Sequence, residues 1–536
     1  MNALALEKKL ALLPVLLEDK SIRSIHRITD AARNTITHLL LRTRDHGADL
    51  TDGILPAAPT RPHKEGRRRR SAFSASFRPL MFLCVAVTVG GWMGAQNLAG
   101  TDKAAKDPGP RGAPISAGGF LPGVTAAQLA QASDGAARFE EPETFRSGLG
   151  PFYNSGPVHA CSGCHAQPSS GGTSPSATVY PFIGANPQAT VDYNEDGARN
   201  IIPPFIAPDG PVREMRLDYF HNPDGSLNRK VPDGGVHDLF TVTGRSDNAS
   251  CTLSQPNFAH ELALGNAVFR IPTPLYGLGL IENIDDATIL ANQAANATAK
   301  AALGISGQPN RSANDGTISR FGWKAQNKSL LMFAGEAYNV EVGVSNEVFP
   351  TKRPAPGGVL PAGCKINRTP EDRSNPELAG VAVNSDVTAF AAFARLLAPP
   401  ARGPSSMSTQ RGQQEFTLVG CALCHTPSMT TAKSTEANAL SGVQANLFSD
   451  LLVHNMGLGL ADAVSQGNAN GQQFRTAPLW GLGQRIFFLH DGRTSDVLEA
   501  IEAHSSRGSE AQGVISNFNA LSPSQQQDLL NFLRSL

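Results

Sequence analysis

Apolar residues in the C-terminal region recur at the three- and four-residue intervals of amphipathic helices. The last predicted helix begins with the motif SPSQ, in which Ser522 is the capping residue, the proline occupies the first turn and the glutamine completes a capping box. Its inner face is expected to carry Leu529, Leu533 and Leu536. Residues 385–400 predict another helix, which ends at two consecutive prolines. This helix either begins a second domain or connects two domains.

Residues 494–504 (TSDVLEAIEAH) predict a further helix, with a serine or aspartate at its start. Val497, Ile501 and His504 would lie on one face of it, because they follow one another at helical intervals. We expect that face to turn inward and to carry His504 with it. The alternative is a histidine in solvent at the helix end, where it would interact favourably with the helix dipole.

A basic block followed by an apolar run predicts an export signal or a signal anchor. Residues 67–70 are four arginines, and residues 79–95 (PLMFLCVAVTVGGWMGA) are almost entirely apolar. A run of this length lies near the lower limit for a membrane span, and no clean cleavage site follows it. The alternative is a buried core helix. The positive flank predicts that the chain after residue 100 is periplasmic, either soluble after cleavage or tethered to the inner membrane.

Charge and composition divide the chain into an N-terminal part and a main body. Residues 1–100 hold 15 Lys/Arg and 8 Asp/Glu, and the remainder holds 31 and 38, so the main body is acidic and we expect no nucleic acid partner. The 52 glycines and 38 prolines predict long loops between modest helices. We assign residues 1–66 to an extension of unknown role, which a mis-assigned start would also explain, 67–100 to the export segment, 101–125 to a tether, 126–384 to a first domain and 385–536 to a second.

Two C-x-x-C-H motifs carry the chemistry that the sequence predicts. One contains Cys161, Cys164 and His165, and the other runs from Cys421 to His425 and includes Cys424. This spacing is typical of c-type haem attachment, in which each thiol adds to a porphyrin vinyl group and the histidine is the proximal iron ligand. A zinc site or a redox dithiol is the alternative, but neither requires the histidine that directly follows. The sequence therefore predicts two covalently bound haems, one in each domain.

Internal echoes predict that the two haem units share one plan. The segments GAARF and GQQEF precede the two motifs, and each would be a helix that leads into its haem site. The segments FRIPTPLYGLG and FRTAPLWGLG follow them. Arg270 and Arg475 occupy the same place in this second echo, which makes them candidates to bind haem propionates. Structural ion pairs are the alternative for both arginines.

The remaining cysteines suggest a disulfide in the exported body. Cys84 lies inside the apolar run, so Cys251 and Cys364 are left over. In an oxidising compartment these two could form a disulfide. Two unrelated buried thiols are the alternative, because sequence alone does not show that they are close in space.

Residues 126–536 resemble the dihaem oxidoreductase family of peroxidase-like proteins, also called thiol-oxidoreductase-like proteins, which are relatives of the bacterial dihaem cytochrome c peroxidases and of MauG. The resemblance implies a mainly α fold of two cytochrome c-like haem domains with long loops and a few short strands. The matching stretches are GLGPFYNSGPVHACSGCH, DGGVHDLF, FRIPTPLYGLGLIE, RFGWKA and FRTAPLWGLGQRIFFLHDGR, continuing through LEAIEAH.

The resemblance also implies ligands for the second haem. In the related peroxidases a methionine is the distal ligand of the electron-entry haem, at the end of a helix that follows an HDG motif. His504 stands at that place here, which implies coordination by His425 and His504 and a site that is closed to substrate. His454 and His490 are expected to be structural, and either would be a ligand if His504 is not.

The first haem is then the candidate reaction centre, which needs an acid–base group beside an open iron position. The candidates are His237, His260 and Glu282, and a helix-start carboxylate is the alternative role for the glutamate. Trp323 is the candidate aromatic bridge between the haems, with Trp480 as runner-up; either residue might simply belong to the core.

These assignments predict an enzyme that takes electrons from a small redox protein at the second haem and reduces hydrogen peroxide at the first. A non-enzymatic electron carrier with two six-coordinate irons is one alternative. MauG-like or oxygenase chemistry on another substrate is the other. The sixth ligand of the first haem distinguishes these functions, and the sequence does not reveal it.

Overall fold

The computed structural model describes residues 104–112, 117–154, 159–175, 186–189, 197–237, 239–244, 249–352, 363–364, 369–374 and 384–536. The predicted export segment and the extension before it lie outside these described residues, as does Cys84. Within the ranges described, no helix has both the length and the apolar character that a membrane crossing requires.

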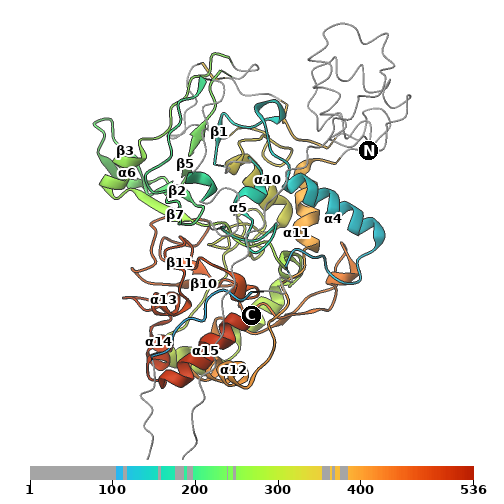
Figure 1. Ribbon diagram of the computed structural model, residues 1–536, viewed down its shortest axis with the longest axis vertical. Coiled ribbons are helices and arrows are strands. Elements are labelled where there is room, and N and C mark those ends of the chain that lie inside the picture. Colours follow the sequence, from blue (N-terminus) through green and yellow to red (C-terminus); the bar gives the residue numbers. More distant parts are fainter. Residues whose placement is uncertain are drawn as a thin grey trace, which may run out of the picture. The chain divides into compact units, whose positions relative to one another are not determined.

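The described chain contains helices and short strands (Figure 1), and its regular secondary structure is mainly helical as expected. The twelve α-helices within these ranges are α4 (Ala126–Phe139), α5 (Cys161–Cys164), α6 (Phe258–Leu264), α7 (Leu278–Glu282), α8 (Asp286–Ala294), α9 (Ala297–Leu303), α10 (Leu330–Glu341), α11 (Asp386–Leu396), α12 (Met407–Leu418), α13 (Val497–Glu502), α14 (Gln512–Asn519) and α15 (Pro523–Ser535).

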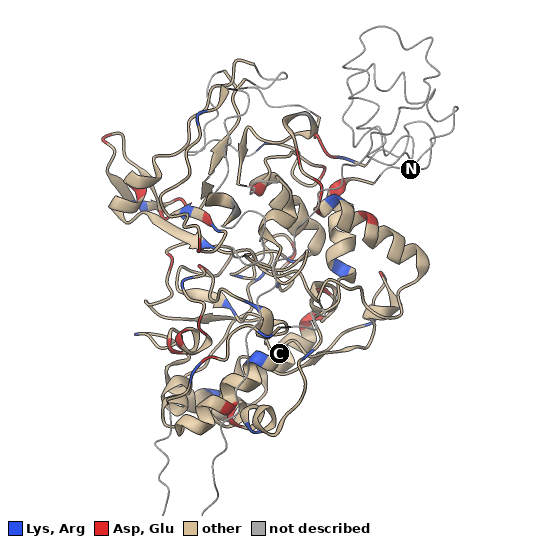
Figure 2. Cartoon of the chain, viewed as in Figure 1, with Lys and Arg blue, Asp and Glu red and all other residues tan. Residues whose placement is uncertain are grey.

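The strands form several small antiparallel sheets rather than one layer. Strand β2 lies between β5 and β7, and the pairs β1–β6, β3–β4, β8–β9 and β10–β11 complete the described set. Their bounds are β1 (Phe152–Tyr153), β2 (Glu214–Leu217), β3 (Tyr219–His221), β4 (Leu227–Pro232), β5 (Val236–His237), β6 (Phe240–Thr241), β7 (Ala267–Arg270), β8 (Met429–Thr430), β9 (Gln444–Ala445), β10 (Val453–Asn455) and β11 (Gln473–Arg475). Figure 2 shows acidic and basic segments interspersed along these elements.

Two helix pairs repeat the same packing. Helix α4 crosses α11, and helix α12 crosses α15 (Figure 1). At each crossing a glycine of the first helix lies directly against the backbone of the second. A Cβ atom on Gly135 would lie 2.1 Å from the carbonyl oxygen of Ala389, and one on Gly412 would lie 1.9 Å from that of Asp528. Since real contacts of this kind exceed 3 Å, both crossings require glycine. These glycines belong to the GAARF and GQQEF echoes.

The second sequence echo packs in the same register on the same two helices. A Cβ atom on Gly279 would lie 1.8 Å from the carbonyl oxygen of Arg395, and one on Gly483 would lie 2.1 Å from that of Arg534. In each unit this second carbonyl is six residues after the first. The duplicated plan predicted from sequence therefore extends to the backbone contacts of both units.

Helix α11 packs with the first motif's elements. It contacts α4, α10 and α7, and its aromatic residues Phe390 and Phe393 lie in the apolar cluster that contains Phe139 and Tyr338. The predicted boundary at residue 385 assigns this helix to the second domain, whereas its contacts place it with the first. The reason is that an amphipathic pattern marks a buried face without identifying its partner.

The C-terminal helix begins as the sequence predicts. Ser522 and Gln525 form a reciprocal capping box, Pro523 occupies the first turn, and Leu529 and Leu533 are buried. The helix predicted over residues 494–504 is shorter than expected. It is α13, which Asp496 caps.

The two remaining cysteines are paired. Cys251 and Cys364 form a disulfide across 113 residues of sequence, so the open question about them is settled in favour of the bridge. Such a bond persists in oxidising compartments and is rare in the cytosol.

Replacing Gly412 with alanine tests the helix crossing. We expect a loss of about 1–3 kcal/mol in unfolding free energy, because the new methyl group overpacks against the backbone of α15. Gly119→Ala is the matched control, since a Cβ atom there meets nothing within 4 Å and should change stability by less than about 0.5 kcal/mol. Denaturant unfolding of the haem-loaded protein measures both, and equal stabilities would contradict the tight crossing.

Candidate functional site

Two cavities of nearly equal volume, about 200 and 210 Å³, lie beside the two C-x-x-C-H motifs. Cys161, Cys164 and His165 line the first cavity. Cys421, Cys424 and His425 line the second. Each motif therefore borders a cavity of similar volume, as expected for two motifs with the same spacing.

Each motif histidine is held in the same way. The ring of Phe139 lies 5.9 Å from that of His165, and the ring of Phe416 lies 6.3 Å from that of His425. The Nδ1 atom of His165 hydrogen-bonds to the carbonyl oxygen of Gly172 at 3.1 Å, and that of His425 to the carbonyl oxygen of Phe448 at 3.0 Å. A ring that donates through Nδ1 presents Nε2 as a metal ligand.

Burial keeps both motif histidines neutral. Desolvation lowers the pKa of His165 to about 4 and that of His425 to about 4, although backbone hydrogen bonds oppose the effect. Imidazole must be neutral to coordinate a metal. Both rings are therefore in the form that a haem iron takes.

His504 lines the second cavity together with His425. Its Nδ1 atom hydrogen-bonds to the carbonyl oxygen of Ala500 at 2.7 Å, the same arrangement that the motif histidines show. Burial lowers the pKa of His504. It stands two residues after α13, where the end of that helix directs it to the cavity.

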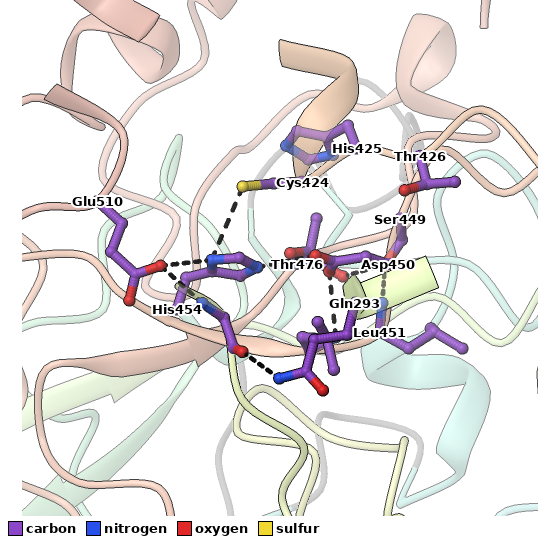
Figure 3. A network of polar contacts seen from close by, with 12 residues as sticks. Gln293, Cys424, His425, Thr426, Ser449, Asp450, Leu451, His454, Thr476 and Glu510 are labelled. Atoms are coloured by element: carbon purple, nitrogen blue, oxygen red, sulfur yellow. Dashed lines mark hydrogen bonds and ion pairs between the residues drawn. The ribbon is translucent and has the colours of Figure 1, made fainter. Parts of the chain in front are cut away.

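His454 also lines the second cavity, but carboxylates engage both of its ring nitrogens (Figure 3). Asp450 lies 2.9 Å from Nε2, and Glu510 lies 2.8 Å from Nδ1. Burial by itself lowers the pKa of His454, yet Asp450 and the other neighbours raise it well above its usual value. The ligand atoms of Cys424, Asp450 and His454 lie within reach of one shared ion, but the contacts are those of an ion-pair network.

His490 lines the second cavity too and lies within an aromatic stack. Its ring is 4.3 Å from that of Phe474 and 6.4 Å from that of Trp323. Burial, followed by the charge of Arg270, lowers its pKa well below the usual value.

The arginines of the second cavity provide a test of whether a haem fits. Arg475 lines the cavity, but its Nε atom donates to the carbonyl oxygen of Gly322 at 3.0 Å. Arg485 lines it as well, is 7% exposed, and has Nε and Nη2 atoms with no protein partner. Buried guanidinium nitrogens without a partner are costly unless an anion meets them, and a porphyrin propionate is such an anion. The residues present therefore fit a haem. The sequence analysis did not identify Arg485 as a residue of this site.

The first cavity differs from the second in its ligand set. Among the described residues that line it, His165 is the sole histidine and there is no methionine. The second cavity holds His504, His454, His490 and Met456 in addition to the motif histidine. The first cavity thus offers a haem iron one strong protein ligand, and its remaining wall carries carboxyl, carboxamide and aromatic groups.

One face of α10 forms a wall of the first cavity and ends in a carboxyl group. The lining residues Leu330, Phe333, Ala334, Ala337, Tyr338 and Glu341 recur at three- and four-residue intervals along that helix. Burial, together with the charge of Glu214, raises the pKa of Glu341 well above its usual value. Sequence reasoning missed this glutamate, although the helical stripe that ends on it was a usable signal.

The acid–base candidates proposed from sequence lie away from the cavity walls. Glu282 pairs with Arg395 at 2.6 Å and accepts a hydrogen bond from the backbone nitrogen of Leu330, at the start of α10. His237 is buried on β5, 3.1 Å from Asp233. His260 is exposed on α6. None of the three candidates is among the described residues that line the first cavity.

Arg270 lines the first cavity, as expected for the first member of the echo. It forms an ion pair with Asp462, which also lies 3.1 Å from the Nζ atom of Lys324. Strand pairing sets Arg270 opposite Glu214, because β7 and β2 are in register at these two residues.

Trp323 lines both cavities. Its Nε1 atom donates to the carbonyl oxygen of Ile271 at 2.9 Å, which fixes the indole between the two sites. Trp480, the runner-up, lies in the apolar core against Gly277 and is not among the described lining residues of either cavity.

A family model described as "Di-haem oxidoreductase, putative peroxidase" matches residues 228–536, which is more than half of the chain. The family predicted from the sequence motifs is therefore confirmed. No curated protein matches the chain.

Ten chains of solved structures match. One is from a Kuenenia stuttgartiensis hydrazine synthase pressurised with 20 bar xenon, with 17% identity, a TM-score of 0.19, and coverage of 30% of this chain and 59% of that chain. Another is a MauG-like protein associated with microbial copper homeostasis, with 18% identity, a TM-score of 0.20, and coverage of 28% and 52%. The match thus spans little more than half of each relative.

Replacing His504 with alanine tests its place in the second site. If it is the sixth ligand there, the variant should lose one low-spin signal in the electron paramagnetic resonance (EPR) spectrum of the haem-loaded protein and gain a high-spin signal. His260→Ala is the control, since this exposed histidine faces neither cavity. An unchanged low-spin signal in the His504 variant would contradict the assignment and leave His454, His490 or Met456 as ligand.

Proposed function

The chain belongs to the di-haem oxidoreductase family, and from that premise we propose that it is a dihaem c-type cytochrome that reduces hydrogen peroxide. The observation that supports this proposal is the difference between the potential iron ligands of the two cavities. The second is lined by His504 together with its motif histidine, and the first has no further histidine or methionine among its described lining residues. An iron with a single strong protein ligand keeps a position for substrate.

Cys161 and Cys164 would hold one haem and Cys421 and Cys424 the other, by thioether bonds, with His165 and His425 as proximal ligands. The haems would supply the electron transfer. The reaction takes one peroxide, two electrons and two protons to two waters. The protein must therefore bring protons to the first cavity and keep bulk water from the site.

Residues of the first cavity suit that task. Glu341 lines this cavity, and burial raises the pKa of its carboxyl group well above the usual value, which favours the protonated form that a proton donor needs. Phe333, Ala334 and Ala337 on the same helix face make the adjoining wall apolar. We assign the acid–base role to Glu341 in place of Glu282 and His237, because a proton donor has to line the cavity that it serves.

We propose that electrons enter at the second haem from a small redox protein and cross to the first. Trp323 is the bridge in this scheme, because its side chain is a wall of both cavities. The His425/His504 ligand set would make the second haem a low-potential, closed site, which suits an electron relay.

We further propose a periplasmic location, with possible inner-membrane tethering through the apolar run at residues 79–95. The Cys251–Cys364 disulfide supports an oxidising compartment. Cell fractionation that finds the haem-loaded protein in the cytosol would contradict this location.

EPR spectroscopy of the oxidised and half-reduced protein, with and without cyanide, tests the function. We expect one low-spin signal that cyanide leaves unchanged and one signal that cyanide shifts, together with peroxide consumption by the reduced protein. Two low-spin signals that cyanide leaves unmoved in both redox states would contradict the peroxidase and favour an electron carrier. A cyanide-sensitive signal without peroxide consumption would favour MauG-like or oxygenase chemistry on another substrate.

Replacing Trp323 with leucine tests the route between the haems. We expect electron transfer from the second haem to the first to slow about tenfold or more, equivalent to an increase of about 1.4 kcal/mol in the activation barrier. Trp480→Leu is the matched control, because that indole lies in the core and should change stability rather than the transfer rate. Stopped-flow absorbance after mixing the reduced protein with peroxide follows the second haem, and equal rates in both variants would exclude Trp323 as the bridge.

A further inference from the structure

The first cavity contains a second carboxyl group beside Glu341. Glu214 opens strand β2 and lines the same cavity, and the carboxyl groups of the two glutamates lie close enough to share a hydrogen bond. They come from segments more than a hundred residues apart, so the contact exists only in the folded chain. Neither was recognisable as a partner of the other from sequence.

A hydrogen bond between two carboxyl groups contains a proton. Two ionised carboxylates have acceptors but no donor, so one member of the pair must carry an O–H group. Two buried like charges in contact would also repel each other strongly. The pair therefore has one proton and one negative charge.

The surrounding charges decide which member is the anion. Arg216 donates through Nε to the carboxylate of Glu214 at 2.9 Å, and its Nη2 atom lies 2.9 Å from the same oxygen. Strand register sets Arg270 opposite Glu214 as well. Burial raises the pKa of Glu214, but Arg216 and the other partners bring it below the usual value. The negative charge is thus on Glu214 and the proton on Glu341.

The groups that surround Glu341 differ from those that surround Glu214. The backbone nitrogen of Asn154 donates to the carbonyl oxygen of Glu341 at the end of α10, and the side chain of Asn154 favours the ionised form of Glu341. Arg216 favours its ionised form, but burial and the charge of Glu214 outweigh that effect. The other charged groups that act on the pair or on its arginines are Glu336, Asp218 and Asp491.

We propose that Glu214 and Glu341 are a proton-sharing pair that stores one proton at the reaction cavity, with Glu214 as a second catalytic carboxyl group. This inference rests on the proposed function, because a stored proton is useful where a reaction consumes protons. Glu341 gives its proton to one peroxide oxygen, which leaves as water when the O–O bond breaks and the redox protein supplies two electrons. The other oxygen is left at the level of hydroxide and becomes the second water with a second proton, which solvent supplies through the pair. The two carboxylates then left in contact repel, which draws a proton from solvent back to the pair.

Infrared spectroscopy tests the shared proton without any turnover. The haem-loaded protein at pH 7 should show the carbonyl stretch of one protonated, buried carboxyl group, which shifts in heavy water and on ¹³C labelling of glutamate. Glu341→Gln removes the proton carrier, and Glu214→Gln leaves Glu341 as the sole anion beside Arg216, so both variants should lose the band. A band that survives in either variant, or is absent from the unchanged protein, overturns the pair.

Peroxide kinetics test the catalytic role separately. We expect Glu341→Gln to lower the rate of the peroxide step about 100-fold or more, and Glu214→Gln about 10- to 100-fold. Glu347→Gln is the matched control, since that glutamate accepts hydrogen bonds from Ser374 and is not among the described residues that line either cavity. A full rate in Glu214→Gln overturns the catalytic role.

The two readouts separate the two proposals. If the unchanged protein consumes no peroxide, the proposed reaction fails, and the infrared band still decides whether the pair shares a proton. If peroxide is consumed but the band criteria are not met, the pair fails and the peroxidase stands. Circular dichroism checks that the isosteric glutamine variants remain folded.

Discussion

Close helix crossings at two glycines determine how both sites are built. Because Gly135 and Gly412 have no side chain, α4 and α12 approach the backbone carbonyls of α11 and α15 directly. The last turns of the two helices carry Phe139 and Phe416 near the motif histidines. Helices α11 and α15 each place an aromatic residue against one of these phenylalanines. A bulkier residue at either crossing would separate the helices and shift the aromatic wall of a site.

The same framework supports two different environments. The echo segments and their carbonyl contacts are alike in both units, so the difference lies in what each unit adds around its cavity. The second unit brings His504 to its cavity from the end of α13. The first unit adds β2, β7 and α10, which bring carboxyl and guanidinium groups instead. One scaffold thus surrounds one cavity with several histidines and the other with carboxyl and guanidinium groups.

The charged groups of the first site lie close together, and each is balanced by a neighbour of opposite charge. Arg216 lies against Glu214 and favours its charged form, whereas burial and the charge of Glu214 raise the pKa of Glu341. Arg270 would add positive charge to the same place, but Asp462 neutralises part of it. Such a cluster is stable in a low dielectric only while every charge has a partner, which links the proton chemistry of the site to its packing.

The sequence by itself determined the family and the duplicated plan and predicted covalent haem attachment, because C-x-x-C-H motifs, caps and echoed segments are local patterns. It also pointed to Trp323 as a bridge and to the Cys251–Cys364 pairing as one of two readings. Tertiary structure alone decided which unit α11 joins and which carboxyl groups face the cavity. Glu214 meets Glu341 through strand register and helix direction, and no local pattern encodes the distance between segments that are far apart in sequence.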